Sequence, residues 1–432
     1  MRKSASKKKI TVGFFPPFFN LAETGRAVMI AKRYTEMGGK AIFFSHGGKF
    51  EFLAEKNGFE IVKVKPNVTQ EQIDEWFKFQ NFEKLKIKSL LNEEWLLKNV
   101  VEEIKAFKKT GIKILVSTNN LTCAISARAA KIPYINITAS GGNFSLKMPD
   151  ALENPLTLLI PQKIKVRTTN FFLERANWYL KPVNRVAKKV NAPTFSNWRD
   201  IFHGDYTFVT DYIDFVNIFP NQQLYDSDEY KGMILLDELF SGNIPKKEAG
   251  KIDKKIEKHL KRPGKSIMVS LGSSGTKETF IEILNTLNKT KYNVVAVYAS
   301  IFDEKDLPKT SKNILLVKFV PTISRVNSQV DLAIIHGGQG TVYNSIYSKK
   351  PVIGFPMHME QQFNLEKIVG HGIGIMLSKK FFSSKKLLKA VDEIFTNYEK
   401  YLANIEKLLE KIPPADGDKI IAREIIKITK KV

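Results

Sequence analysis

The chain has 432 residues, of which 43% are hydrophobic, and this length is typical of two globular domains of ordinary size. Its single cysteine, Cys123, excludes a disulfide framework and fits a reducing cytosol. No apolar run reaches the ~18 residues that would span a bilayer. The basic N-terminus leads into a short apolar stretch that prolines interrupt, so we expect no signal peptide.

The net charge of +24 indicates an anionic partner, or else a lysine-rich composition with solvated side chains. None of the common nucleic-acid-binding motifs is present, so we expect no nucleic acid as a partner. Between Lys163 and Lys189, basic residues are interleaved with aromatic ones, a pattern typical of segments that lie at a membrane surface. We therefore predict an anionic membrane surface as a partner of this region. A helix that packs the same aromatic residues into its own domain would explain the pattern equally well.

The first 240 residues alternate short apolar runs with helical patterns, as in a parallel, doubly wound sheet. Strands are predicted at 10–15, 41–44, 60–64, 112–116, 134–137, 206–210 and 233–236, and helical segments at 27–34, 50–56, 70–110 and 124–130. The stretch 141–200 departs from this alternation and is predicted to be an irregular insertion with helices.

The second half repeats the architecture but not the sequence of the first. Strands are predicted at 266–271, 294–298, 314–319, 332–335 and 352–356, with helices at 278–287, after residue 341 and over 384–430. The sequence therefore predicts two α/β domains with parallel sheets, the second of which begins near residue 241.

A glycine-rich turn follows the buried strand 332–335. It contains three glycines and two side-chain donors, namely Gly337, Gly338, Gly340, His336 and Thr341. Glycines let backbone N–H groups approach a ligand closely, and the N-terminus of the next helix favours an anion such as a diphosphate. The strand 352–356 leads to Glu360 and Gln361, whose carboxylate and amide suit sugar hydroxyls. Together they predict a nucleotide-sugar site.

This segment, from His336 to Asn364, resembles the donor-binding signature of the UDP-dependent glycosyltransferases with the GT-B fold. That group includes plant and mammalian UDP-glycosyltransferases, the bacterial enzyme that makes lipid II, and archaeal relatives. The resemblance implies two Rossmann-like domains that face a cleft: 1–240 for the acceptor and 241–405 for the nucleotide sugar. It also implies that 406–432 packs back on the first domain.

The resemblance places further donor contacts in the second domain. Phe319, Val320 and Pro321 occupy the position of the segment that holds the base, and Gly272, Ser273 and Ser274 that of the loop beside the diphosphate. Asn344 stands where the family has a glutamate that binds the ribose hydroxyls. An amide can still accept one hydrogen bond and donate another, so ribose binding is expected in an altered form, and nucleotides other than UDP stay open.

Catalysis is where the chain departs from the family. Inverting members place a histidine in the first loop and orient it with an aspartate; here Glu23 and Thr118 occupy these positions. A carboxylate base needs no carboxylate partner, so Glu23 is the candidate general base, with His46 as a substitute. Glu23 could instead only complement the helix dipole. The apolar loop that would suit a lipid acceptor contains Phe15, Phe18 and Phe19.

Together with these patterns, the resemblance implies a cytoplasmic hexosyltransferase, peripheral on the inner face of the cell membrane. It would move a hexose or N-acetylhexosamine from a UDP-sugar to a hydroxyl of a lipid or lipid-linked sugar, with inversion. The donor turn would stabilise the leaving diphosphate without a metal or other cofactor, and Asp226 and Asp228 are expected to form a solvated acidic patch. The alternatives are a non-catalytic donor-binding scaffold subunit or, less favoured by the motif, a sugar-nucleotide epimerase.

Overall fold

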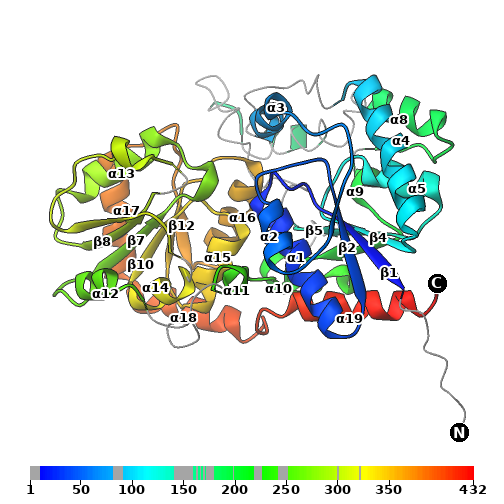
Figure 1. Cartoon of the computed structure of the whole chain (residues 1–432). Helices are drawn as coiled ribbons and strands as arrows, with labels where there is room; N and C mark the ends of the chain where they lie inside the picture. The colour runs from blue at the N-terminus through cyan, green and yellow to red at the C-terminus, as the bar shows by residue number, and fades with distance from the viewer. Residues whose placement is uncertain are drawn as a thin grey trace, which may run out of the picture.

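Two parallel sheets of six strands each form the centres of two domains that lie side by side (Figure 1). The computed structural model describes residues 10–80, 91–140, 159–161, 164–165, 167–168, 171, 180–197, 199–217, 226–241, 252–298, 301–320 and 323–432. The strand orders are β3-β2-β1-β4-β5-β6 and β12-β11-β10-β7-β8-β9. In each sheet the order reverses beside the first strand, and the predicted pair of doubly wound domains is confirmed.

The first domain is built from residues before 240. Its strands are β1 (Thr11–Phe15), β2 (Lys40–Ser45), β3 (Ile61–Lys63), β4 (Ile114–Ser117), β5 (Tyr134–Thr138) and β6 (Tyr206–Val209). Its described helices are α1 (Leu21–Glu36), α2 (Glu51–Lys56), α3 (Gln70–Gln80), α4 (Glu93–Thr110), α5 (Cys123–Ala130), α8 (Leu180–Lys189), α9 (Arg199–Phe202) and α10 (Ile213–Val216). A short helix α11 (Asp237–Ser241) leads toward the second domain.

The second domain carries the strands β7 (Ser266–Ser270), β8 (Asn293–Val297), β9 (Ile314–Val317), β10 (Leu332–Ile335), β11 (Val352–Gly354) and β12 (Gly374–Met376). Its described helices are α12 (Lys254–Leu260), α13 (Lys277–Leu287), α14 (Ile323–Gln329), α15 (Gln339–Tyr347), α16 (Met359–Gly370), α17 (Ser384–Thr396) and α18 (Tyr398–Leu409). Because the strands are buried on both faces, they are nearly continuous apolar runs, and this made them readable in the sequence.

Each face of the first sheet has its own apolar core. On one face, α1 packs Val28 against Phe14, and on the other, α4 packs Leu96 near Leu115. Successive residues of a strand point to opposite faces, so Phe14 and Phe15 of β1 belong to different cores. The carboxyl end of β1 is thereby held rigidly where the chain turns into α1.

The last helix, α19 (Gly417–Thr429), crosses from the second domain and lies along α1 (Figure 1, red). Ile421 and Ile425 of α19 are fully buried in the same apolar core as Val28. At the start of this helix, Asp418 accepts a hydrogen bond from Arg33 of α1 at 2.7 Å. The two domains are therefore joined by two crossings of the chain.

The structure corrects three details of the predicted elements. The stretch 233–236 is not a strand but an irregular segment in which Met233 and Ile234 are buried. The segment predicted as helical over 70–110 contains two separate helices, α3 and α4. Strand β12 was missed, because three residues are too few to show a period. Much of the predicted insertion 141–200 lies outside the described residues, and its described part includes α8 and α9.

Candidate functional site

The glycine turn lies at the carboxyl end of β10, where the chain enters α15. Gly337 has a φ of +88°, a conformation that favours glycine, and Gly338 occupies the N-cap position of the helix. Open space surrounds Gly340, since a Cβ atom built there would meet nothing within 4 Å. The N-terminus of α15 therefore provides the N–H groups and dipole end of an anion site.

The His336 ring is held between two glycines. A Cβ atom at Gly272 would lie 2.6 Å from its Cε1, and one at Gly338 would lie closer still to its Nε2. The ring Nδ1 is 3.4 Å from the carbonyl oxygen of Ser270. Burial lowers the pKa of His336 to about 4, so the ring is neutral at neutral pH. The sequence placed Gly272 and His336 in one site, and the structure brings them into contact.

The first turn of α16 connects the donor segments to each other. Gln361 donates to the hydroxyl of Ser274 at 2.7 Å and accepts from the backbone N–H of Met357 at 2.9 Å. Asn364 donates to the carbonyl oxygen of Gly337 at 3.0 Å. The turn that contains Gly272, Ser273 and Ser274 is thus fastened to the predicted sugar-binding residues. Burial also lowers the pKa of the neighbouring His358 to about 4.

Asn344 and Phe319 are the residues predicted to contact the ribose and the base. Asn344 is buried on α15, and its Oδ1 has no hydrogen-bond partner. One turn later Ser348 donates to Ser324 of α14, so this face of α15 points toward the segment after β9. In that segment Phe319 is 54% exposed while Val320 is buried. Pro321 lies outside the described residues.

Thr341 differs from the expectation. Its hydroxyl donates to the carbonyl oxygen of Gly338 at 2.8 Å, so its proton is engaged within the first turn of α15. The predicted donor role of the Thr341 side chain toward a ligand is therefore not what the structure shows. Its remaining acceptor capacity and its backbone N–H are what it can offer.

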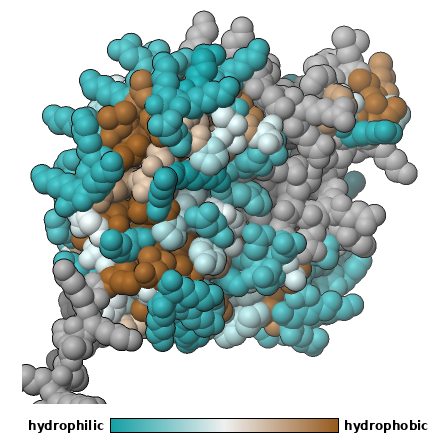
Figure 2. Space-filling view, turned by 90° about the vertical axis from the view of Figure 1, so that its right-hand side faces the viewer, coloured by the Kyte–Doolittle hydropathy of each residue, from teal (hydrophilic) through white to brown (hydrophobic). Residues whose placement is uncertain are grey.

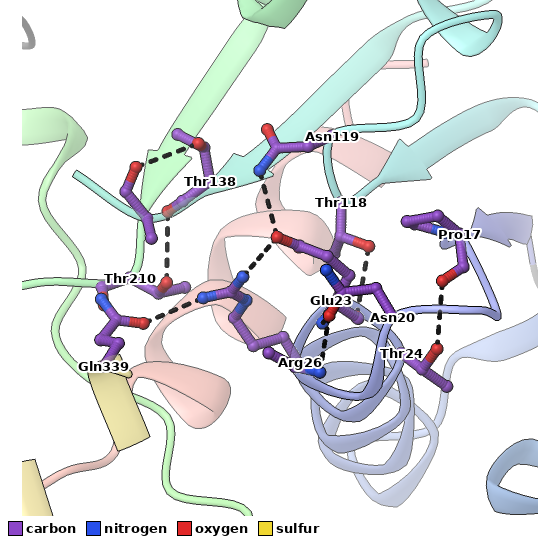
Figure 3. A network of polar contacts seen from close by, with 12 residues as sticks. Pro17, Asn20, Glu23, Thr24, Arg26, Thr118, Asn119, Thr138, Thr210 and Gln339 are labelled. Atoms are coloured by element: carbon purple, nitrogen blue, oxygen red, sulfur yellow. Dashed lines mark hydrogen bonds and ion pairs between the residues drawn. The ribbon is translucent and has the colours of Figure 1, made fainter. Parts of the chain in front are cut away.

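Glu23 lies in the first turn of α1, which Asn20 caps (Figure 3). Its carboxylate forms an ion pair with Arg26 at 2.6 Å and accepts a hydrogen bond from Asn119 at 3.3 Å. The other carboxylate oxygen, Oε2, is buried without a partner. Burial raises the pKa of Glu23; Arg26 and Asn119 lower it, whereas Glu360 from the second domain raises it further.

The loop after β4 reaches Glu23, as the resemblance implied, but through a different residue. Thr118 donates to the backbone carbonyl of Glu23 at 3.2 Å, and it is Asn119 that contacts the carboxylate. Asn119 has a positive φ of 58°, which asparagine tolerates better than most residues. An asparagine just after a strand was the available sequence signal, and it was missed.

The two halves of the site meet at the domain junction. Arg26 donates to the side-chain carbonyl of Gln339 at 2.9 Å (Figure 3), and Gln339 donates to Asp211 at 3.0 Å. Glu360, which is half-buried, lies near the same group: desolvation raises its pKa, Arg26 lowers it and Asp211 raises it. Sequence reasoning missed Arg26, Gln339 and Asp211 as site residues. Gln339 is the variable position of the family pattern, so no motif marked it.

His46 is not placed to act as a base. Its Nε2 lies 2.7 Å from the fully buried carboxylate of Glu103, and its Nδ1 lies 3.0 Å from the carbonyl oxygen of Val64. Its ring also packs against Phe15 with centroids 5.1 Å apart. Both ring nitrogens are thus engaged in the interior of the first domain, and the substitute role for His46 is rejected.

Two of the predicted acceptor residues belong to the core. Phe15 and Phe18 are each 1% exposed and pack into the two cores of the first sheet. Their apolar character was correctly noticed, but it reflects packing and not a surface for a lipid. Phe19 is partly buried and packs edge to face on Phe77, with ring centroids 6.4 Å apart.

The described part of the chain contains no group of three or more His, Cys, Asp or Glu that could hold a metal ion. Asp226 caps the short 3-10 turn Ser227–Glu229, in which Asp228 also lies.

Among the described helices, none has the length and apolar character to cross a membrane.

Known proteins with a similar sequence or structure were compared with this chain. A Mycobacterium tuberculosis protein named PGL/p-HBAD biosynthesis glycosyltransferase is 24% identical over 320 residues, which are 71% of this chain and 69% of that protein. A PGL/p-HBAD biosynthesis rhamnosyltransferase of Mycobacterium bovis is 23% identical over 314 residues, 70% of this chain and 65% of that protein. Both are similar over more than the donor signature.

Solved structures show the same fold over nearly the whole chain. The calicheamicin glycosyltransferase CalG4 has a TM-score of 0.66 at 14% identity, covering 98% of this chain and 99% of its own. The glycosyltransferase VinC, solved in complex with DTDP, has a TM-score of 0.65 at 13% identity, covering 98% and 100%. The fold is therefore GT-B. The family model described as UDP-glucoronosyl and UDP-glucosyl transferase matches residues 54–412, and the chain belongs to that family of glycosyltransferases.

Proposed function

We propose that this protein transfers a hexose or N-acetylhexosamine from a UDP-sugar to a hydroxyl group of a lipid or lipid-linked sugar, with inversion. The observation that carries the proposal is the carboxylate of Glu23 at the domain junction: its ion-pair partner Arg26 donates to Gln339 at the start of α15, and the charge of Glu360 acts on it from the second domain. A carboxylate whose pKa burial raises above its ordinary value is a stronger base and is suited to accept a proton during the reaction.

The reaction follows from this placement. Glu23 accepts the proton of the acceptor hydroxyl as its oxygen forms a bond to the anomeric carbon. The bond from that carbon to the diphosphate oxygen breaks, and the electron pair leaves with the diphosphate. The N-terminus of α15 stabilises the developing charge, since its N–H groups and dipole point at that position. Attack from the side opposite the leaving group inverts the anomeric carbon.

The direct test is a transfer assay. UDP-glucose and UDP-N-acetylglucosamine are incubated with the protein and membrane lipid extracts, and products are identified by mass spectrometry and NMR. The expected product is a β-linked glycolipid, which the Glu23→Gln variant should form about 10²–10⁴-fold more slowly. If the wild type binds UDP but transfers sugar to no hydroxyl acceptor, the enzyme proposal fails and a donor-binding scaffold subunit is the better description.

Uridine is the proposed nucleotide, and Asn344 sets how strongly the ribose is selected. Its single amide oxygen replaces the two oxygens of a carboxylate, so we expect weak discrimination between UDP and 2′-deoxy-UDP. A hydrogen bond to a charged group contributes about 1.5–3 kcal/mol. Asn344→Glu is therefore expected to raise the preference for UDP by about tenfold or more, measured by calorimetry with both nucleotides. Equal preference in the two proteins would remove Asn344 from the ribose site.

We further propose that the protein works at the cytoplasmic face of an anionic membrane, through the outer side of α8. Leu180 and Val183 of this helix are buried. A cavity of about 430 Å³ beside it is lined by cations and an aromatic ring, among them Lys181, Lys188 and Phe195. Figure 2, which shows the molecule from the side of the first domain, has apolar patches set in a hydrophilic surface.

Sedimentation with vesicles of phosphatidylglycerol and phosphatidylcholine tests this surface. The double substitution Lys181→Gln and Lys188→Gln is expected to weaken binding at low salt about thirtyfold, from ~1 kcal/mol per lysine. Lys385 and Lys389 are exposed on α17 of the second domain, so their replacement by Gln is the matched control. Binding that needs no anionic lipid, or that both double variants reduce equally, contradicts the proposed surface.

A further inference from the structure

Arg26 is a buried arginine that contacts both domains. It is 6% exposed, and its two terminal nitrogens have different partners: Nη2 donates to Glu23 at 2.6 Å, and Nη1 donates to Gln339 at 2.9 Å (Figure 3). The first partner belongs to its own helix α1 and the second to α15 of the other domain. A planar guanidinium holds two such partners in a fixed relative geometry.

Gln339 directs its side-chain carbonyl at Arg26 because its amide group is engaged elsewhere. The amide nitrogen donates to the backbone carbonyl of Thr210 at 2.8 Å and to Asp211 at 3.0 Å. All three side-chain hydrogen bonds of Gln339 therefore go to the first domain, although the residue begins the helix that follows the donor turn. Asparagine supplies the same acceptor and the same two donors, but its side chain is one methylene shorter.

Asp211 fixes the far end of this arrangement. Its carboxylate accepts hydrogen bonds from Ser140 of the first domain and from Tyr343 of α15, in addition to Gln339. Asp211 is 1% exposed, and it follows β6 directly. The amide of Gln339 is thus held by a buried carboxylate that also binds Ser140 of the first domain and Tyr343 of the second.

We propose that Arg26 is a positioning residue that keeps Glu23 ionised and correctly oriented. Because Arg26 is itself oriented by its hydrogen bond to Gln339, its effect on Glu23 depends on contact between the two domains. The base is assembled only when the helix of the donor turn lies against the first domain. A protein with separated domains would keep Glu23 but lose the partner that orients Arg26. This inference rests on the proposed role of Glu23 as the base.

The charges around Glu23 explain why one arginine has so large an influence. Glu360 of α16 faces Glu23 from the second domain, and Asp211 adds negative charge beside Glu360. Lys367 of α16 also faces Asp211, but burial lowers its pKa strongly. The loop after β4 contributes only the neutral Thr118 and Asn119. Without Arg26, repulsion and burial would both favour the protonated form of Glu23.

The experiment is the pH dependence of kcat/KM for Arg26→Gln, Arg26→Lys and the wild type. The acidic limb reports ionisation of the free base, so Arg26→Gln is expected to move it to higher pH by about one unit or more. Arg26→Lys keeps the positive charge, so the acidic limb of its pH profile is expected to lie close to that of the wild type. Lys32 lies on the same helix and pairs with Glu238 of α11. Lys32→Gln therefore removes a cation that does not contact Glu23, and this matched control should show the pH dependence of the wild type.

Gln339→Leu tests the link between the domains. It is expected to lower kcat at least tenfold while UDP affinity changes less than threefold, and the effect of Arg26→Gln should shrink in its background, since the two residues act through one contact. Additive effects would refute the link. If Glu23→Gln retains wild-type turnover, the proposed base fails; if it is inactive but Arg26→Gln titrates like the wild type, only the positioning role of Arg26 fails.

Discussion

Replacement of Glu23 by Gln is expected to lower kcat by about 10²–10⁴-fold, the usual contribution of a general base. Glutamine keeps the size of the side chain and can still contact Arg26 and Asn119, but it cannot accept the proton of the acceptor hydroxyl. UDP affinity should stay within about twofold, because the donor residues lie in the second domain. Steady-state transfer kinetics and a calorimetric UDP titration measure the two quantities separately.

Glu36→Gln is the matched control for this substitution. Glu36 lies on the same helix, where it pairs with Arg33 at 3.0 Å, and its side chain is half exposed. The loss of such an exposed pair costs little, in the range of about 0–1 kcal/mol, so turnover should persist. Wild-type turnover in Glu23→Gln would refute the assignment, and equal losses in both variants would point to a general effect on the helix.

Gly338→Ala is expected to weaken UDP binding by about tenfold to a hundredfold. A Cβ atom at this position would overlap the His336 ring, which Gly272 confines from the other side. The ring must shift into the donor turn, and such overpacking costs ~1–3 kcal/mol. Unfolding should show a lower Tm in the same variant, since the strain is internal to the protein.

Gly340→Ala, two residues further, separates internal strain from ligand contact. A Cβ atom at Gly340 meets no protein atom within 4 Å, and alanine stabilises a helix by up to about 1 kcal/mol relative to glycine. Its Tm should therefore equal or exceed that of the wild type, while the new methyl group obstructs a diphosphate at the helix N-terminus. Undiminished UDP binding in this variant would place the diphosphate elsewhere.

The arrangement of the residues predicted to bind the donor could be anticipated because they are nearly contiguous in the sequence. A strand, three glycines and the start of a helix can each be recognised from neighbouring residues. The apolar runs that identify β10 and β11 also place the glycine turn between them at the carboxyl end of a buried strand. The structure added one feature that no local pattern contained, namely that Gln361 binds Ser274 from a segment much earlier in the chain.

The catalytic half could be predicted only in part. Alignment with a loop of the family selected Glu23, but Asn119, Gln339 and Asp211 come from three distant segments and have polar side chains without periodicity. Their importance arises from the junction between the domains, which sequence spacing does not describe. The prediction that Phe15 and Phe18 line the acceptor site was wrong because both are buried in the core. In a sequence, an apolar residue beside a loop looks the same whether it lines a site or packs in a core.

The position of α19 also has a consequence for synthesis of the chain. The apolar face of α1 is completed by Ile421 and Ile425, which are synthesised after both sheets. Domains usually mature as units while translation proceeds, N-terminal part first. Here the apolar core of the first domain is complete only after the second domain has been synthesised, and until then part of α1 is uncovered. A fragment ending at the junction near residue 240 would leave that face uncovered and is expected to aggregate, so the two domains are expected to fold as one unit.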